Sequence, residues 1–536
     1  MNVEMRFDNR FCYAGGIIVL NCIILGVGVF DSLVQRILFD LFVIASVFVG
    51  STNIRFCGIA RFVLLFVLLY FCIDYGAVFG LGFHVDDIFS DVFSILFATT
   101  TNEAETFLKN IILGRPFRLI LSVLTFIFSL IYFSFVCKAK NKNIIKRKFI
   151  YWTLCYIVIW FFLMLSTSFV GGRVSVFVSK IPGYIEQIEN SVKVSEERKK
   201  FKWDAASKIA NEQIVVIILG ETTRGDHMSI CGYSRETTPL LSTCGVVAFK
   251  DSISIGNHTL LSTPYMLTRK RVDLDNINKL FPETSIISAF KEAGFKTYYL
   301  SYLRSIHVGD SAINQIVSEA DVYIKRKSGQ EEDSLFLPIV DDVIKNDKSD
   351  KKMIMIKLIG SHFNYQDRYP VDFDYFKPSF KTEEYSGFDL SKKQVFLNTY
   401  DNSILHTDYV VYQIIQKLQS SGVGDVSLAF ISDHGTNIME DGKRLYGGFV
   451  KGNYNAAMFY WLGESVKERL KNNLDMFYSN INKPVDSTYF VDTVLTLSGI
   501  VTSKKVGKDL FIHEVDALDN RKVVVGDKVR FYRSLE

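Results

Sequence analysis

Apolar residues are concentrated in the first third of the chain. Three stretches there carry no charged residue: Phe11 to Phe30, Leu119 to Cys137 and Phe149 to Gly172. Two further stretches lie between the first and second of these, weakened by Asp40 and Asp74. Because about 20 apolar residues cross a bilayer core of about 30 Å, the pattern predicts a five-span transmembrane domain at residues 1–172. The first span lacks a small-x-small cleavage site, so we expect a retained anchor rather than a signal peptide.

Basic residues flank the apolar stretches unevenly. When all five stretches are numbered along the chain, basic residues lie before the first, between the second and third, and between the fourth and fifth. These residues are Arg6, Arg10, Arg55, Arg61, Lys138, Lys140, Lys142, Lys146, Arg147 and Lys148. Because cytoplasmic loops accumulate Lys and Arg, these segments are predicted to face the cytoplasm. The loop at residues 82–116, with five acidic and two basic residues, then lies outside. An odd number of spans also exports everything after Gly172.

After the last apolar stretch the pattern changes to that of a water-soluble domain. Residues 173–212 are predicted to form an amphipathic connector on the membrane surface, and a solvated helix explains them equally well. From residue 213 to 536, short apolar runs alternate with helical spacing, which predicts an α/β domain with a mostly parallel sheet. The predicted strands are Ile214–Leu219, Phe295–Leu300, Met353–Ile359, Val426–Ile431 and Met458–Leu462. The predicted helices are Ser285–Ala293, Leu335–Ile344, Tyr400–Gln419 and Tyr489–Leu497.

Three predicted strands end in polar residues able to do chemistry. Glu221 follows the first, Gly360-Ser361-His362 the third, and Asp433-His434 the fourth. Sites in such folds lie beyond the carboxyl ends of the strands. Glu221, Asp433 and His434 are the ligand types of a catalytic zinc, which takes three protein ligands and keeps one open position. A single Asp-His-Gly is more often a capped turn. The convergence of three strand ends nevertheless favours a metal site.

Composition excludes two broad classes of function. The chain is 49% hydrophobic with mean hydropathy +0.18, which is too apolar for an ordinary cytosolic enzyme of 536 residues. Its net charge is only +4, which gives no support for bulk nucleic-acid binding.

The motifs themselves resemble a known family. Val216 to Arg224, Gly232 to Pro239, Gly360-Ser361-His362 and Ser432 to Gly435 are similar to the phosphoethanolamine transferases of Gram-negative bacteria, which include the mobile colistin-resistance enzymes. That family belongs to the alkaline phosphatase and sulfatase superfamily. The resemblance implies a bacterial inner-membrane enzyme whose sulfatase-like domain lies in the periplasm.

The resemblance also implies a mechanism. The family nucleophile is a threonine, and the stretch Gly256 to Pro264 matches its context, which makes Thr259 the expected nucleophile. Zn²⁺ would be held by Glu221, Asp433, His434 and Thr259, with one ion firmly expected and a second left open. A phosphoethanolamine group would pass from phosphatidylethanolamine to Thr259 and then to a lipopolysaccharide acceptor, in lipid A, the core or the O-antigen.

Other positions receive roles from the same resemblance. His362 is expected to contact the transferred phosphate, serve a second metal or act as general acid. His258 is a candidate acid or base, and a core or solvated histidine is equally open. Glu103 is a candidate partner of the ethanolamine ammonium, although a solvated acidic loop also explains it. Asn455 stands where many family members have histidine and is expected to contact substrate as an amide donor.

Alternatives within the superfamily remain to be separated. A phosphoglycerol transferase is the nearest. A formylglycine sulfatase is disfavoured because the stretch Ser262 to Met266 ends in methionine where arginine is required. A scaffold or transporter would have no need of metal-type residues at strand ends. Cys231 and Cys244 are the two cysteines of the predicted exported domain, and whether they pair is open.

Overall fold

The computed structural model describes residues 197–535, except 199, 273–281, 303–311, 327–331, 385–388, 443–446, 504–506 and 527. The five apolar stretches, Glu103 and most of the predicted connector lie outside the described residues. Within the described part, we find no helix with the length and hydrophobicity that crossing a bilayer requires.

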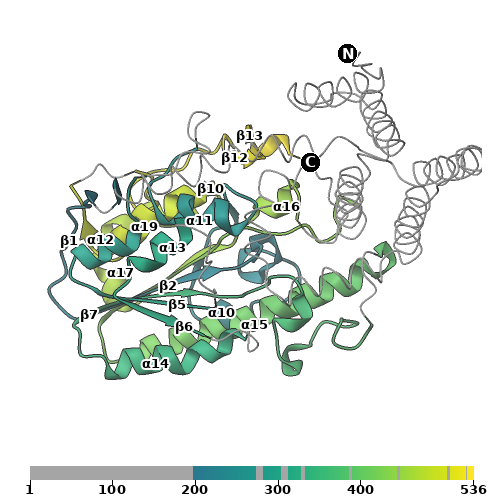
Figure 1. Ribbon diagram of the computed structural model, residues 1–536, viewed down its shortest axis with the longest axis horizontal. Helices are drawn as coiled ribbons and strands as arrows, with labels where there is room; N and C mark the ends of the chain where they lie inside the picture. The colour runs from purple at the N-terminus through teal and green to yellow at the C-terminus, as the bar shows by residue number, and fades with distance from the viewer. Residues whose placement is uncertain are drawn as a thin grey trace, which may run out of the picture. The chain divides into compact units, whose positions relative to one another are not determined.

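A seven-stranded sheet forms the centre of the domain (Figure 1), in the order β3-β9-β8-β2-β7-β5-β6. Its strands are β2 (Gln213–Gly220), β3 (Val247–Ala248), β5 (Lys296–Ser301), β6 (Val322–Lys325), β7 (Lys351–Lys357), β8 (Asp425–Ser432) and β9 (Met458–Leu462). β2 is parallel to both of its neighbours, and β5 is parallel to β6 and β7. β9 runs antiparallel to β8 and to β3. The predicted α/β fold with a mostly parallel sheet is confirmed.

Helices cover both faces of this sheet, with α14 and α15 on the opposite side from α11, α12 and α19 (Figure 1). The helices are α10 (Pro239–Ser242), α11 (Thr259–Leu267), α12 (Ile286–Glu292), α13 (Ala312–Ser318), α14 (Leu337–Asn346), α15 (Lys393–Gln419), α16 (Lys451–Tyr454), α17 (Glu464–Leu470), α18 (Leu474–Ser479) and α19 (Phe490–Leu497). Smaller pairings complete the fold: β1 (Ala206–Ser207) with β11 (Ile500–Val501), β4 (Asp251–Ile253) with β10 (Pro484–Asp486), and β12 (Lys522–Val525) with β13 (Lys528–Phe531).

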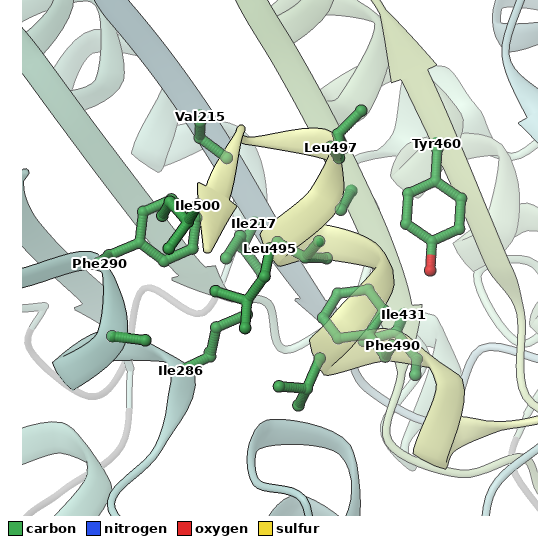
Figure 2. Close-up of a cluster of buried hydrophobic side chains, with 14 of the residues drawn as sticks. Val215, Ile217, Ile286, Phe290, Ile431, Tyr460, Phe490, Leu495, Leu497 and Ile500 are labelled. Carbon is green, nitrogen blue, oxygen red and sulfur yellow. The ribbon is translucent and has the colours of Figure 1, made fainter. Parts of the chain in front are cut away.

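The core explains why the central strands are apolar on every residue. All eight positions of β2 and all eight of β8 are buried, because helices cover both faces. On one face, Val215 and Ile217 pack with Phe290 of α12 and Leu495 of α19 in one cluster (Figure 2). Burying a Val, Leu or Phe side chain contributes about 1.5–3 kcal/mol. A core of this size holds the carboxyl ends of β2, β7 and β8 in fixed register.

Residues before the sheet also belong to this core. Trp203 is fully buried, and its indole N–H donates to Thr284 Oγ1 at 3.0 Å. The carboxylate of Glu292 accepts from the backbone N–H groups of Trp203 and Ala205. The last residues of the segment predicted as a connector therefore pack against the α/β domain.

Candidate metal centre and nucleophile

Glu221 is placed by the central strand of the sheet. It follows Gly220, the last residue of β2, at the carboxyl edge between β7 and β8. The chain turns sharply at Thr222, whose φ of 57° is rare for a β-branched residue. Tyr400 of α15 secures this turn, because its hydroxyl donates to Thr222 O at 2.7 Å and accepts from Arg224 N at 2.9 Å. A strained turn thus holds the Glu221 carboxylate at the end of the sheet.

Asp433 and His434 come from the neighbouring strand β8. Asp433 is fully buried, and its Oδ1 accepts from the backbone N–H groups of Thr222 and His434 at 3.1 and 2.8 Å. The Nδ1–H of His434 donates to Gly435 O at 2.7 Å. This bond orients the ring and leaves Nε2 as the nitrogen available to a metal.

Glu221, Asp433 and His434 form one cluster. Each offers a ligand atom, and these atoms lie within 4.8 Å of one another. His434 Nε2 is 3.3 Å from Glu221 Oε1 and 3.7 Å from Asp433 Oδ2. Two carboxylates and an imidazole are a donor set that suits Zn²⁺. The residues present therefore fit a zinc ion.

Thr259 is the first residue of α11, and its hydroxyl reaches this cluster. Its Oγ1 donates toward Glu221 Oε2 at 3.2 Å. The N-terminus of a helix favours negative charge, which suits a reactive oxygen and a phosphate. His258 is the residue before the helix and is partly buried, and its backbone carbonyl accepts from Ser262 N. The predicted nucleophile and the three predicted metal ligands lie together in space.

The loop that carries His362 packs against the backbone of Glu221. Ser361 N donates to Glu221 O at 2.9 Å. Gly360 has φ +51°, and a Cβ there would lie 2.6 Å from Glu221 O. His362 Nδ1 lies 2.8 Å from Phe363 O, and His362 contributes to lowering the pKa of Glu221, less than Lys357 and His434 do. His362 thus lies within electrostatic reach of the cluster.

Asn455 has a structural partner. Its side-chain Oδ1 accepts from the backbone N–H of Asp226 at 3.1 Å. This contact orients the amide toward the loop after β2. Its expected role in binding substrate stays a prediction.

Lys357 is a residue of this site that sequence reasoning missed. It ends β7, and its Nζ lies 2.8 Å from Glu221 Oε2 and 3.0 Å from Asp433 Oδ2. Burial alone would lower the pKa of Lys357, but the carboxylates of Asp433 and Glu221 outweigh it and raise that pKa. The available signal was a lysine at the end of an apolar strand that lies, in chain order, between the strands that lead to Glu221 and Asp433.

The charges of the cluster act on one another. Burial alone would raise the pKa of Glu221, but Lys357 and His434 hold it well below its ordinary value. Burial alone would lower the pKa of His434, but Asp433 and Glu221 raise it to about 9. Without a metal the imidazole is therefore protonated at neutral pH. A metal ion binding at Nε2 displaces that proton.

Residues of α15 support the loops around the site. Asp401 is fully buried and accepts from His227 Nδ1, Tyr233 and Arg235. Asp408 accepts from the N–H groups of Leu240 and Leu241, in α10. These contacts hold the loops around the site against α15.

Cys231 and Cys244 are both free thiols. Cys231 is buried, and burial raises its pKa to about 12. A disulfide between them, left open by the sequence, is not formed.

Comparison with known proteins places the domain in a family. The family model described as Sulfatase matches residues 213–500, more than half of the chain. The chain belongs to the sulfatase family. The strand ends that carry Glu221, Asp433 and His434 all fall inside the match.

Two curated relatives of this sulfatase-family chain are named as phosphoethanolamine transferases. Phosphoethanolamine transferase EptA of Salmonella typhimurium is 28% identical over 305 residues, 54% of this chain and 54% of that protein. Kdo(2)-lipid A phosphoethanolamine 7''-transferase of Escherichia coli K12 is 31% identical over 248 residues, 45% of this chain and 42% of that protein. The matches span about half the length of these relatives. The resemblance indicated by the motifs is confirmed.

Solved structures share the fold. The C-terminal periplasmic domain of EcEptC from Escherichia coli, in complex with Zn, has a TM-score of 0.54 at 20% identity and covers 62% of this chain and 96% of that one. The integral membrane lipooligosaccharide phosphoethanolamine transferase A from Neisseria meningitidis has a TM-score of 0.55 at 18% identity and covers 92% of this chain and 93% of that one. The sulfatase-like architecture expected from the sequence is confirmed for the described domain.

Proposed function

We propose that this protein transfers phosphoethanolamine from phosphatidylethanolamine to a lipopolysaccharide acceptor, in lipid A, the core or the O-antigen. The observation that carries the proposal is the hydroxyl of Thr259 beside the cluster of Glu221, Asp433 and His434. The names of the curated relatives supply the transferred group and one acceptor.

Thr259 is the nucleophile in this proposal. Its oxygen attacks phosphorus of the donor, the bond from phosphorus to the glycerol oxygen breaks, and diacylglycerol leaves. A threonine hydroxyl is unreactive at pH 7 unless its proton is removed. The Glu221 carboxylate accepts the hydrogen bond of that hydroxyl. An acceptor hydroxyl then attacks the same phosphorus, its proton passes to the histidine that protonated the diacylglycerol, and the bond to Thr259 breaks.

Zinc would be held by Glu221, Asp433, His434 and Thr259, and a bound zinc supplies stabilisation of negative charge on oxygen. His362 is the proposed acid that protonates the leaving oxygen, and His258 is a second candidate. Asn455 is proposed to contact substrate as an amide donor, and Glu103 to pair with the ethanolamine ammonium.

The remaining parts of the chain are proposed to locate the reaction at a membrane. We propose that residues 1–172 form a five-span anchor in the bacterial inner membrane, with residues 173–212 as a connector and 213–536 as the catalytic domain in the periplasm. The donor lipid and the growing lipopolysaccharide are both accessible at that membrane face. The apolar pattern of the sequence supports this placement.

Thr259→Ala tests the chemistry directly. The full-length chain is incubated with phosphatidylethanolamine labelled in its headgroup, and the intact protein and the acceptor lipopolysaccharide are analysed by mass spectrometry. The unaltered chain should acquire one phosphoethanolamine on Thr259 and pass it on. Thr263→Ala, one turn later on α11, is the matched control, because the Thr263 hydroxyl donates to Thr259 O.

Two outcomes would contradict the proposal. A covalent adduct that survives Thr259→Ala excludes this residue as nucleophile. Labelled phosphatidylglycerol that replaces phosphatidylethanolamine as the efficient donor identifies a phosphoglycerol transferase instead.

A further inference from the structure

The buried ammonium of Lys357 is bound on several sides. Besides Glu221 and Asp433, it donates to the carbonyl of Gly220 at 2.9 Å. Lys357 is only 6% exposed. Its backbone is fixed as well, because β7 pairs with β2 on one side and β5 on the other. The ammonium is therefore a fixed charge of the site and cannot swing into solvent without breaking these bonds.

Lys357 contacts the oxygens that a metal would share. Glu221 Oε2 contacts both Lys357 Nζ and the Thr259 hydroxyl. Asp433 Oδ2 contacts both Lys357 Nζ and His434 Nε2. The other Asp433 oxygen is already used by two backbone N–H groups. One dication can use the remaining lone pairs of these carboxylates, but a second ion bound to the same two oxygens would have to displace the ammonium.

Charge leads to the same conclusion. The two carboxylates carry two negative charges, and Lys357 already neutralises one of them inside a buried site. One dication then leaves a small net charge, which an ionised nucleophile balances. A second dication would add two further positive charges next to a fixed ammonium, where burial makes repulsion strong. Within the described residues, moreover, one group of three or more metal-type residues is present, namely Glu221, Asp433 and His434.

We propose that the fixed charge of Lys357, beside Glu221 and Asp433, restricts the site to a single divalent ion. The ammonium takes the place that a second cation would otherwise fill. The inference rests on the metal-assisted transfer proposed above and specifies its metal content.

Metal stoichiometry tests this role. Full-length unaltered chain, Lys357→His, Lys357→Met and Lys352→Met are dialysed against excess Zn²⁺, and bound zinc per chain is measured by inductively coupled plasma mass spectrometry. Lys352 is the matched control, because it is equally buried on β7 but lies at the other end of the strand. The unaltered chain and Lys352→Met should hold one zinc ion each.

The two variants at position 357 should differ from these two proteins, each in its own way. Lys357→His removes the charge and adds a ligand nitrogen, so a second zinc ion should bind. Lys357→Met removes the charge alone, so competition with a chelator should show zinc held at least about tenfold more tightly, because repulsion of the dication is lost. Thermal unfolding of each variant establishes that it is folded.

Each contrary result has a separate meaning. Two zinc ions in the unaltered chain, one ion in a folded Lys357→His, or unchanged or weaker zinc binding by a folded Lys357→Met overturns the role of Lys357. A chain that binds no zinc contradicts the metal-assisted transfer itself. If Thr259→Ala removes the adduct while the unaltered chain holds two ions, the proposed function stands and this inference fails.

Discussion

Thr259 Oγ1 lies 3.2 Å from Glu221 Oε2, although 38 residues separate them in the chain. The contact joins the N-terminus of α11 to the carboxyl end of β2. It brings the hydroxyl that can attack phosphorus to the carboxylate that orients it. Glu221 in turn belongs to the cluster with Asp433 and His434.

Glu221→Gln should weaken zinc binding by more than about tenfold, since even the partners of metal ligands are typically worth 10–100-fold in affinity. The amide removes a negative charge while keeping the size of the side chain. Zinc competition against a chelator measures the effect. Glu292→Gln is the control, because its carboxylate binds the backbone of Trp203 and Ala205. Equal affinities for the two variants would contradict Glu221 as a ligand.

Gly360→Ala should destabilise the domain and reduce transfer together. The left-handed backbone alone costs an L-residue about 1–2 kcal/mol, and the new methyl group would lie 2.6 Å from Glu221 O. Gly422→Ala has the same kind of backbone, with φ +77° and no atom within 4 Å of the added Cβ. Thermal unfolding of both variants separates the two effects. If the two variants lose equal stability, packing against Glu221 is unimportant.

Tyr400→Phe should lower the free energy of unfolding by about 1–3 kcal/mol, because two buried backbone groups lose their partner. The hydroxyl bonds Thr222 O and Arg224 N on the strained turn after Glu221. Denaturant unfolding measures the loss. Tyr365→Phe should cost less, since its hydroxyl makes a 3.4 Å contact with Thr436 Oγ1. The reverse order would show that the turn does not depend on Tyr400.

Asp408→Asn should change how stability depends on pH. Burial raises the pKa of Asp408 to about 7, above the ordinary value of about 4 in the unfolded chain. The native state therefore holds this proton more tightly, so the group favours folding at low pH, and that contribution is lost as pH rises from about 4 through 7.

The asparagine stays neutral, so over this interval the variant should lose less stability than the unaltered chain, by up to a few kcal/mol. Melting temperatures recorded between pH 4 and 8 measure the difference. Asp475→Asn, at an exposed aspartate, should leave the profile unchanged. A parallel profile for Asp408→Asn would exclude this carboxyl as the source.

Local pattern alone predicted much of the fold. Each predicted strand overlaps an observed strand of the central sheet, because a strand buried on both faces must be apolar on both faces. The third was extended to Ile359, but β7 ends at Lys357, where the chain turns toward Gly360. α15 begins at Lys393 instead of Tyr400, since Phe396 packs on Phe380 in a loop distant in sequence. That contact is invisible to helical periodicity.

Local sequence was enough to predict which residues meet at the site, since Glu221, Asp433 and His434 stand at strand ends and Thr259 in a motif. Their charges and hydrogen-bond partners depend on the three-dimensional fold. Lys357 enters the site because β7 lies beside β2, and strand order is set by long-range packing that no local pattern records. The same long-range packing leaves Cys231 and Cys244 unpaired and turns Asn455 toward Asp226.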